Sequence, residues 1–102
     1  MRYFSHVTIQ GFIDPAVRQF FREGRIPRGA GWGVLARITA RKLDLLEYAG
    51  ALSDLASPPG NRLEALRGKL AGRYSIRIND QWRVVFRWTE AGPDEVEIQD
   101  YH

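Results

Sequence analysis

The hydrophobic period of this chain becomes two after residue 73, and that change restricts the folds open to it. Tyr74, Ile76 and Ile78 alternate with polar residues, and Asn79-Asp80 then reads as a tight turn. Residues 82–88 alternate again, with tryptophan and phenylalanine on one side and arginine on the other. A second turn at residues 91–94 leads into the strand pattern EVEIQDY. The C-terminal third therefore predicts a three-stranded antiparallel meander.

The first half of the chain has a different pattern, typical of one strand and two helices. RYFSHVTI at residues 2–9 is rich in aromatic and β-branched types and predicts a strand. Asp14-Pro15 is a favourable helix start and Gly24 a favourable stop. Apolar residues at helical spacing predict a long helix over residues 34–54, which SPPGN at 57–61 ends. We expect an α+β fold, with the two helices packed on one face of a small antiparallel sheet.

Composition limits the domain count and several kinds of chemistry. With 102 residues, 44% of them hydrophobic, the chain is expected to form a single domain over residues 1–102. The absence of cysteine excludes disulfides, cysteine nucleophiles and thiolate metal sites. No apolar run near the N-terminus approaches the length of a signal peptide or a membrane span. We therefore expect a cytoplasmic protein without a membrane partner.

Charge is distributed unevenly along the chain. Residues 62–87 hold seven Arg or Lys and two acids, whereas residues 88–102 hold five acids and no Arg or Lys. Arg83 and Arg87 share one side of a predicted strand. The pattern alone is equally consistent with a solvated sheet face and with a surface that binds phosphate through guanidinium groups. An anionic partner for the basic half is the functional reading.

The last three residues, Asp100-Tyr101-His102, can all take part in proton chemistry. On base rates a polar chain end is the more common explanation. The functional reading is that His102 acts as a general base or acid beside Asp100, which has the same strand parity. No metal is expected, because two histidines and scattered carboxylates lack ligand spacing. There is no P-loop, dinucleotide-binding glycine motif or nucleophile elbow either.

Residues 59–102 carry a family resemblance. The string PPGNRLEALRGKLAGRYSIRINDQWRVVFRWTEAGPDEVEIQDYH resembles the HigB branch of the RelE/ParE toxin superfamily, the plasmid maintenance system killer proteins. Its specific elements are LRG at 66–68, YSIRIN at 74–79, QWR at 81–83 with FRW at 86–88, and the terminal DYH.

The resemblance implies a RelE-like fold and the toxin of a type II toxin-antitoxin system. Such a toxin cleaves mRNA on translating ribosomes without a metal or other cofactor, and thereby inhibits translation and growth. The implied partners are ribosome-bound mRNA and a HigA-type helix-turn-helix antitoxin, through which the toxin reaches operator DNA indirectly.

The resemblance also implies roles for individual residues. His102 and Asp100 are the expected acid and base, and Arg83 and Arg67 are expected to hold the scissile phosphate. Tyr101 is expected to stack on or orient a base. Further candidates for RNA contact are Arg73, Lys69 and Arg87.

Two alternatives remain open at this point. A ParE-like inhibitor of DNA gyrase shares the fold and does not need the acid and base. A toxin-fold protein that only binds its antitoxin is the non-catalytic alternative.

Overall fold

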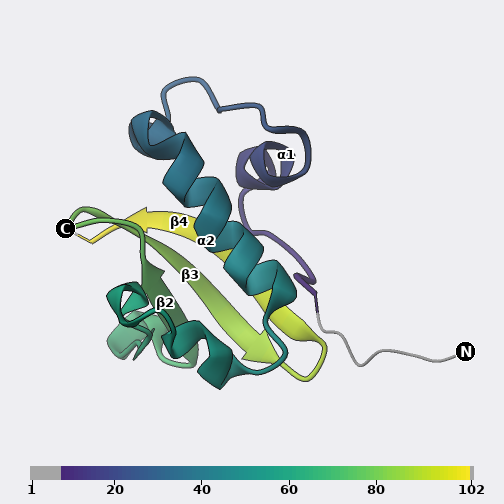
Figure 1. Cartoon of the computed structure of the whole chain (residues 1–102), viewed down its shortest axis with the longest axis vertical. Helices are drawn as coiled ribbons and strands as arrows, with labels where there is room; N and C mark the ends of the chain where they lie inside the picture. The colour runs from purple at the N-terminus through teal and green to yellow at the C-terminus, as the bar shows by residue number, and fades with distance from the viewer. Residues whose placement is uncertain (1–7, 102) are drawn as a thin grey trace, which may run out of the picture.

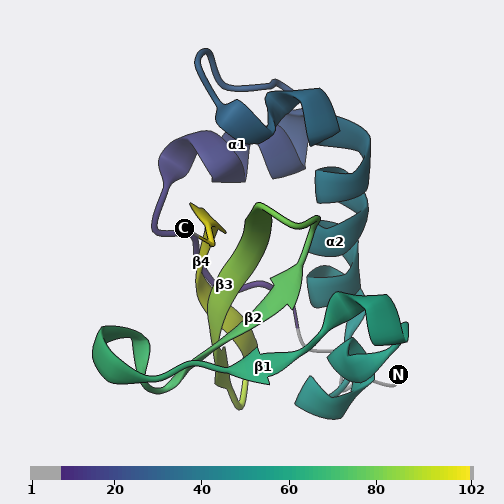
Figure 2. The same ribbon diagram turned by 90° about the vertical axis from the view of Figure 1, so that its left-hand side faces the viewer.

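The computed structural model describes residues 8–101, which form a four-stranded antiparallel sheet with two α-helices on one of its faces (Figure 1). The strands stand side by side in chain order: β1 (Glu64–Ala65), β2 (Arg73–Arg77), β3 (Trp82–Thr89) and β4 (Gly92–Asp100). Figure 2 shows the helices on one side of this sheet, and the predicted α+β class is confirmed.

The predicted hairpin is present as β2 and β3. Its register pairs Ile76 with Val84, and both side chains are fully buried. In the turn, the Asn79 side-chain oxygen accepts hydrogen bonds from the backbone N–H groups of Gln81, at 2.9 Å, and Trp82, at 2.8 Å. An asparagine at this position satisfies two turn donors locally, which explains why the pattern was readable in the sequence.

The predicted turn between the last two strands is present, but its extent over residues 91–94 is wrong, because the turn lies at Glu90-Ala91 and β4 begins at Gly92. Asp94 pairs with Arg87 and Glu97 pairs with Val85, so Glu95 and Val96 together stand opposite Phe86. This is a β-bulge, and Glu95 has a left-handed backbone with φ 51°. For a residue with a side chain that conformation costs about 1 kcal/mol or more. Because of the bulge, the alternation of side chains between the two sheet faces shifts by one residue between the two halves of β4.

Helix α1 (Pro15–Glu23) has the predicted ends. The Asp14 carboxylate accepts a hydrogen bond from the Ala16 N–H at 2.9 Å, and Pro15 occupies the first turn, where it loses no helical bond. Gly24 ends the helix with φ 77°, and its N–H donates to the Phe20 carbonyl at 2.8 Å.

The predicted helix over residues 34–54 is wrong in its extent. A 3-10 turn, η1 (Gly31–Leu35), precedes α2 (Ala36–Tyr48), and a separate 3-10 turn, η2 (Leu52–Ala56), follows it. The Asp54 carboxylate accepts hydrogen bonds from the N–H groups of Gly50, at 2.9 Å, and Ala51, at 3.1 Å. These local bonds favour a fresh turn over continuation of the helix.

The predicted N-terminal strand over residues 2–9 lies largely outside the described residues. Thr8 and Ile9 are not part of a strand, because the Ile9 N–H donates to the Glu47 side chain of α2 at 3.0 Å. The chain meets β4 farther on, in a single parallel bridge between Phe12 and Val96. The fourth strand is therefore β1, at the opposite edge of the sheet.

The core fills the space between the helices and the sheet. Phe20 of α1 packs edge-on against Trp32 of η1, with ring centroids 4.8 Å apart. Further buried apolar side chains of this core come from the two helices, the η2 turn and the strands, among them Val17, Leu43, Leu46, Leu55, Ile76, Val84, Phe86 and Val96. Within residues 8–101, no helix has the length and hydrophobicity to cross a membrane. The helices thus cover one sheet face and leave the other available for a site.

Candidate active site

The sheet face turned away from the helices carries arginines in two cross-strand pairs. Arg73 of β2 stands opposite Arg87 of β3, and Arg77 stands opposite Arg83. Like charges at paired positions repel each other, so each pair needs compensation from other groups.

The Arg73–Arg87 pair is compensated by carboxylates of β4. Arg73 donates to Glu95 at 2.7 Å and to Glu97 at 3.1 Å, and its side chain is only 18% exposed. Glu95 also lies 3.6 Å from the Arg87 Nε. The acidic C-terminal segment therefore neutralises one end of the basic face. Some of the acids in the C-terminal segment thus pair with arginines of the basic segment of the same chain.

The Arg77–Arg83 pair has different surroundings. Arg77 forms an ion pair with Asp80 across the hairpin turn, and Asp80 is almost fully exposed. The Arg83 guanidinium carbon lies 5.0 Å from the centre of the Tyr101 ring, a cation–π contact. Arg83 also donates to the Gln99 side chain at 3.4 Å, a long hydrogen bond. The buried Nε of Arg83 has no hydrogen-bond partner among residues 8–101.

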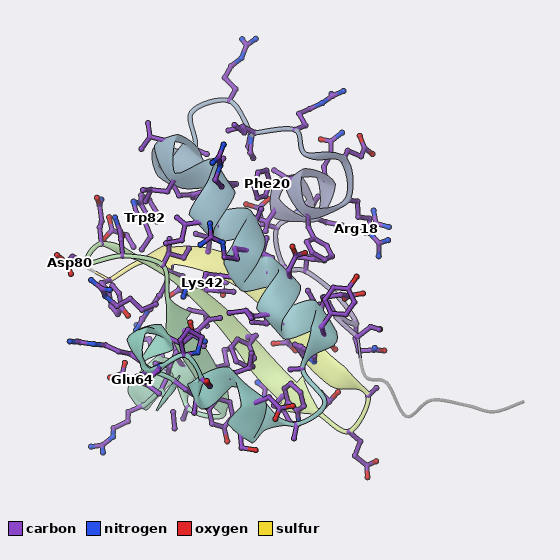
Figure 3. All side chains as sticks on the ribbon, viewed as in Figure 1. Arg18, Phe20, Lys42, Glu64, Asp80 and Trp82 are labelled. Carbon is purple, nitrogen blue, oxygen red and sulfur yellow. The ribbon has the colours of Figure 1, made fainter. Side chains whose placement is uncertain are left out.

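Tyr101 lies at an open pocket of about 300 Å³ at this end of the sheet. The pocket is lined by Arg62, Glu64, Arg77, Asp80 and Tyr101. The Tyr101 N–H donates to the Gln81 carbonyl at 2.7 Å, which fixes the backbone one residue after the end of β4. In Figure 3, Glu64 and Asp80 lie at the left of the view, and Arg18 of α1 lies at the right.

The phenol of Tyr101 is held in its neutral form. Burial is the main cause that raises its pKa above the usual value, and the Glu64 carboxylate adds to the effect. Nearby guanidinium groups act in the opposite direction: Arg83, Arg77 and Arg62. At neutral pH the phenol is therefore an O–H donor beside several cations, a combination suited to an anionic oxygen.

The wall that carries Arg62 and Glu64 is anchored by Asn61, which is fully buried. Its side-chain amide donates to the carbonyls of Leu55, at 3.1 Å, and Ser57, at 3.2 Å. The Asn61 oxygen accepts a hydrogen bond from Lys42 of α2. Burial lowers the pKa of Lys42, and neighbouring Arg41 and Arg77 lower it further. This polar junction joins the helix layer to the pocket wall.

Asp100 and Arg83 do not share a face in the strand register. Asp100 pairs with Trp82 and Arg83 pairs with Gln99, so Asp100 points to the helix side of β4. The Gln81 amide donates to the Asp100 carboxylate at 3.0 Å. Tyr101, the next residue, contacts Arg83 instead. His102 lies outside the described residues.

Arg67 and Lys69 lie in and beside the 3-10 turn η4 (Gly68–Leu70), between β1 and β2. Both side chains are exposed, and neither has an ion pair with another residue of the described range. Figure 2 shows this segment projecting from the sheet on the side away from α2. The η4 segment leads directly into the Arg73 end of β2, whereas Arg83 pairs with Arg77 at the other end of that strand.

Arg62, Glu64 and Arg77 belong to the pocket and were not nominated from the sequence. Arg77 had a readable signal, because it has the same strand parity as Arg73 on a predicted hairpin. Arg62 and Glu64 had none, since β1 has two residues and shows no alternation. In the described part of the chain, His, Asp and Glu side chains form no cluster of three or more with metal-binding geometry.

Comparisons with known proteins identify the relatives of this chain. Residues 10–102 match the family model HigB-like toxin, described as the RelE-like toxin of type II toxin-antitoxin system HigB. The chain is 54% identical over 79 residues to Toxin HigB-1 of Vibrio cholerae, covering 78% of this chain and 82% of that protein. It is 36% identical over 81 residues to an uncharacterized protein of Haemophilus influenzae, covering 76% and 75% of the two chains. The chain therefore belongs to the HigB-like family of RelE-like toxins, and as such a toxin it has an antitoxin as its partner.

Proposed function

We propose that this toxin is a ribosome-dependent, metal-independent endoribonuclease that cleaves mRNA and so inhibits translation and growth. The observation that carries the proposal is the pocket at the end of the sheet, which is lined by the neutral Tyr101 phenol, together with the contact between the Tyr101 ring and Arg83. An uncompensated guanidinium beside an O–H donor is a suitable environment for a phosphodiester.

The proposed reaction is attack of an RNA 2′-hydroxyl on the adjacent phosphorus. A general base removes the 2′ proton, a 2′,3′-cyclic phosphate forms, and the bond to the 5′-oxygen breaks as a general acid protonates that oxygen. We assign the acid and base to His102 and Asp100. We assign Arg83, which lies beside the Tyr101 ring, to the phosphate, while Asp100 points to the helix side of β4 in the strand register.

Negative charge develops on the phosphoryl oxygens during this reaction, and fixed cations lower its energy. Arg83 provides this stabilisation from the sheet, and Arg67 from the projecting η4 segment. Guanidinium groups stay protonated at physiological pH, so the role of both is electrostatic.

RNA binding extends beyond the reacting phosphate. Tyr101 has a partly exposed ring on which a base can stack, and Lys69 is an exposed cation of the η4 segment. Arg73 and Arg87 stay predictions for RNA contact, and at their positions a phosphate competes with Glu95 and Glu97.

The proposed antitoxin is a HigA-type helix-turn-helix protein. The toxin then reaches operator DNA through the antitoxin and not through direct contact. Copurification of the toxin with the product of the adjoining reading frame tests this assignment.

Inducible expression in cells tests the proposed activity. We expect wild-type protein to stop growth and to create new mRNA 5′ ends within translated regions. Arg83→Ala is expected to lower cleavage by about 10²–10³-fold because it removes an electrostatic donor. His102→Ala is expected to lower it by about 10²–10⁴-fold because it removes a general acid or base.

Arg18→Ala is the matched control, since it removes an exposed arginine of α1 far from the pocket in Figure 3. It is expected to cleave like wild type. DNA damage signalling with intact mRNA would contradict the proposal and favour gyrase inhibition. Antitoxin binding without any growth defect would favour a non-catalytic binding module.

A further inference from the structure

The two arginine pairs of the exposed sheet face differ in the charge of the β4 side chains that contact them. This difference affects which pair RNA can reach. Glu95, Glu97 and Gln99 of β4 contact arginines of this face. The two carboxylates contact Arg73 and Arg87, whereas the neutral amide contacts Arg83. The change from acid to amide along β4 coincides with the change from compensated to uncompensated arginine.

The bulge places the first carboxylate between two cations. Glu95 is the extra residue of β4, and its Oε1 lies 2.7 Å from Arg73 and 3.6 Å from Arg87. Arg87 is also confined by the backbone turn at Gly72, where an added Cβ would lie 3.1 Å from the Arg87 Nη1. Arg73 has both terminal nitrogens engaged by carboxylates. Little of the Arg73 guanidinium is left for a phosphate, whereas Arg87 is 43% exposed and has the Glu95 carboxylate beside its Nε.

We propose that Glu95 and Glu97 restrict RNA binding by occupying Arg73 and compensating the charge of Arg87, so that phosphates contact the face at Arg83 instead. This inference rests on the proposed function in taking RNA as the ligand. The carboxylates act as internal substitutes for phosphate, since both anions bind guanidinium through paired oxygens. They confine the strand to the Tyr101 pocket and thereby determine which bond is presented for cleavage.

Binding of a single-stranded RNA without 2′-hydroxyls tests the proposal separately from cleavage. The probe is a fluorescent 2′-O-methyl decamer, and its anisotropy is measured over a range of KCl concentrations. The full-length protein carries Glu95→Gln with Glu97→Gln, which keep the shape of both side chains and remove their charges. For single strands, the logarithm of the association constant falls with the logarithm of the salt concentration by about 0.7 for each phosphate contact. Each contact therefore makes binding roughly fourfold tighter at 0.15 M salt than at 1 M salt.

We expect the double variant to gain one or two contacts. Its salt slope then steepens by about 0.7–1.4, and its affinity at 0.15 M salt rises roughly 4- to 15-fold. Gln99→Glu is the reciprocal change, because it places a carboxylate beside Arg83. That variant is expected to lose about one contact and to bind roughly fourfold more weakly.

Glu90→Gln is the control for net charge. Glu90 is an exposed acid of the β3–β4 turn and makes no ion pair within residues 8–101. Its removal is expected to leave the slope unchanged, because salt screens exposed charges beyond about 8 Å at physiological ionic strength. A double variant that matches this control in slope and affinity overturns the proposal.

Two further readouts keep the outcome decisive. If the double variant does not fold by circular dichroism, Gln99→Glu decides alone, and binding as tight as wild type then refutes the proposal. If the variants shift RNA binding as expected while wild type leaves cellular mRNA intact, the proposed cleavage fails and the restriction by Glu95 and Glu97 stands.

Discussion

Arg73 and Arg83 have the same side chain on the same sheet face, and their partners on β4 differ in charge. Arg73 contacts the Glu97 carboxylate at 3.1 Å, and Arg83 contacts the Gln99 amide at 3.4 Å. An ion pair that is partly shielded from water is stronger than a hydrogen bond to a neutral amide. Residue type alone therefore does not identify a phosphate-binding arginine. The partner across the strand decides it.

Tyr101 provides a test at the same scale through its raised pKa. The folded-state pKa of Tyr101 lies above its unfolded value of 10.0. The contribution of Tyr101 to folding stability is therefore fully present below pH 10 and is lost as pH rises through the folded-state pKa. Tyr101→Phe removes this titration and keeps the ring over Arg83. We expect the variant to lose less stability than wild type between pH 8 and pH 11, measured by urea unfolding. Equal losses in the two proteins would contradict the assignment of a raised pKa to Tyr101.

At the scale of elements, local signals were readable and pairings between distant segments were not. The ends of α1 were predictable because Asp14 and Gly24 act on their own helix. The hairpin was predictable because Asn79 satisfies its own turn. The bulge in β4 was not, since Glu95 is drawn into its conformation by Arg73 and Arg87 on other strands. The early end of α2 was missed because Asp54 bonds backbone groups that a continued helix would use.

The contact between η1 and the sheet makes a prediction about a glycine. A Cβ at Gly31 would lie 2.6 Å from the Trp82 ring, so Gly31→Ala forces the ring or the turn to move. We expect a loss of about 1–3 kcal/mol in the free energy of unfolding, the usual cost of overpacking. Urea denaturation followed by circular dichroism measures it.

Gly60→Ala serves as the comparison, because a Cβ there meets no atom within 4 Å. Its effect is expected to stay within about 0.5 kcal/mol. If both alanine variants unfold at the same urea concentration, the tight contact at Gly31 does not constrain the packing.

At the scale of the whole molecule, the helix layer and the site are connected through Asn61. Lys42 of α2 binds its oxygen, and its amide holds the segment that leads to Arg62 and Glu64. The alternation of β3 predicted the face on which Arg83 lies, whereas Tyr101 was named through the family resemblance. Sequence analysis missed the opposite wall because a buried asparagine, not a repeating pattern, places those residues. Whether Asp100 and His102 supply acid and base stays a prediction.

Asn61→Ala tests this connection. The substitution leaves the carbonyls of Leu55 and Ser57 without donors, so we expect a loss of about 2–4 kcal/mol in unfolding free energy. Lys42→Met removes only the third contact and is expected to cost about 1–2 kcal/mol. Denaturant titration of both variants gives the two values. A smaller loss for Asn61→Ala than for Lys42→Met would show that the two carbonyl contacts carry little stability.

The bulge has a consequence at the level of the gene. The side chains of residues 92–94 alternate regularly between the two faces of the sheet, and so do those of residues 96–101. Glu95 is the single extra residue between these two segments. Deletion of that one codon joins Asp94 to Val96 in an unbroken alternation, so every other side chain of β4 keeps its face. A three-nucleotide insertion or deletion is thus enough for related chains to acquire or lose the carboxylate between Arg73 and Arg87. The core-facing residues of β4 stay on the core side of the sheet in both cases.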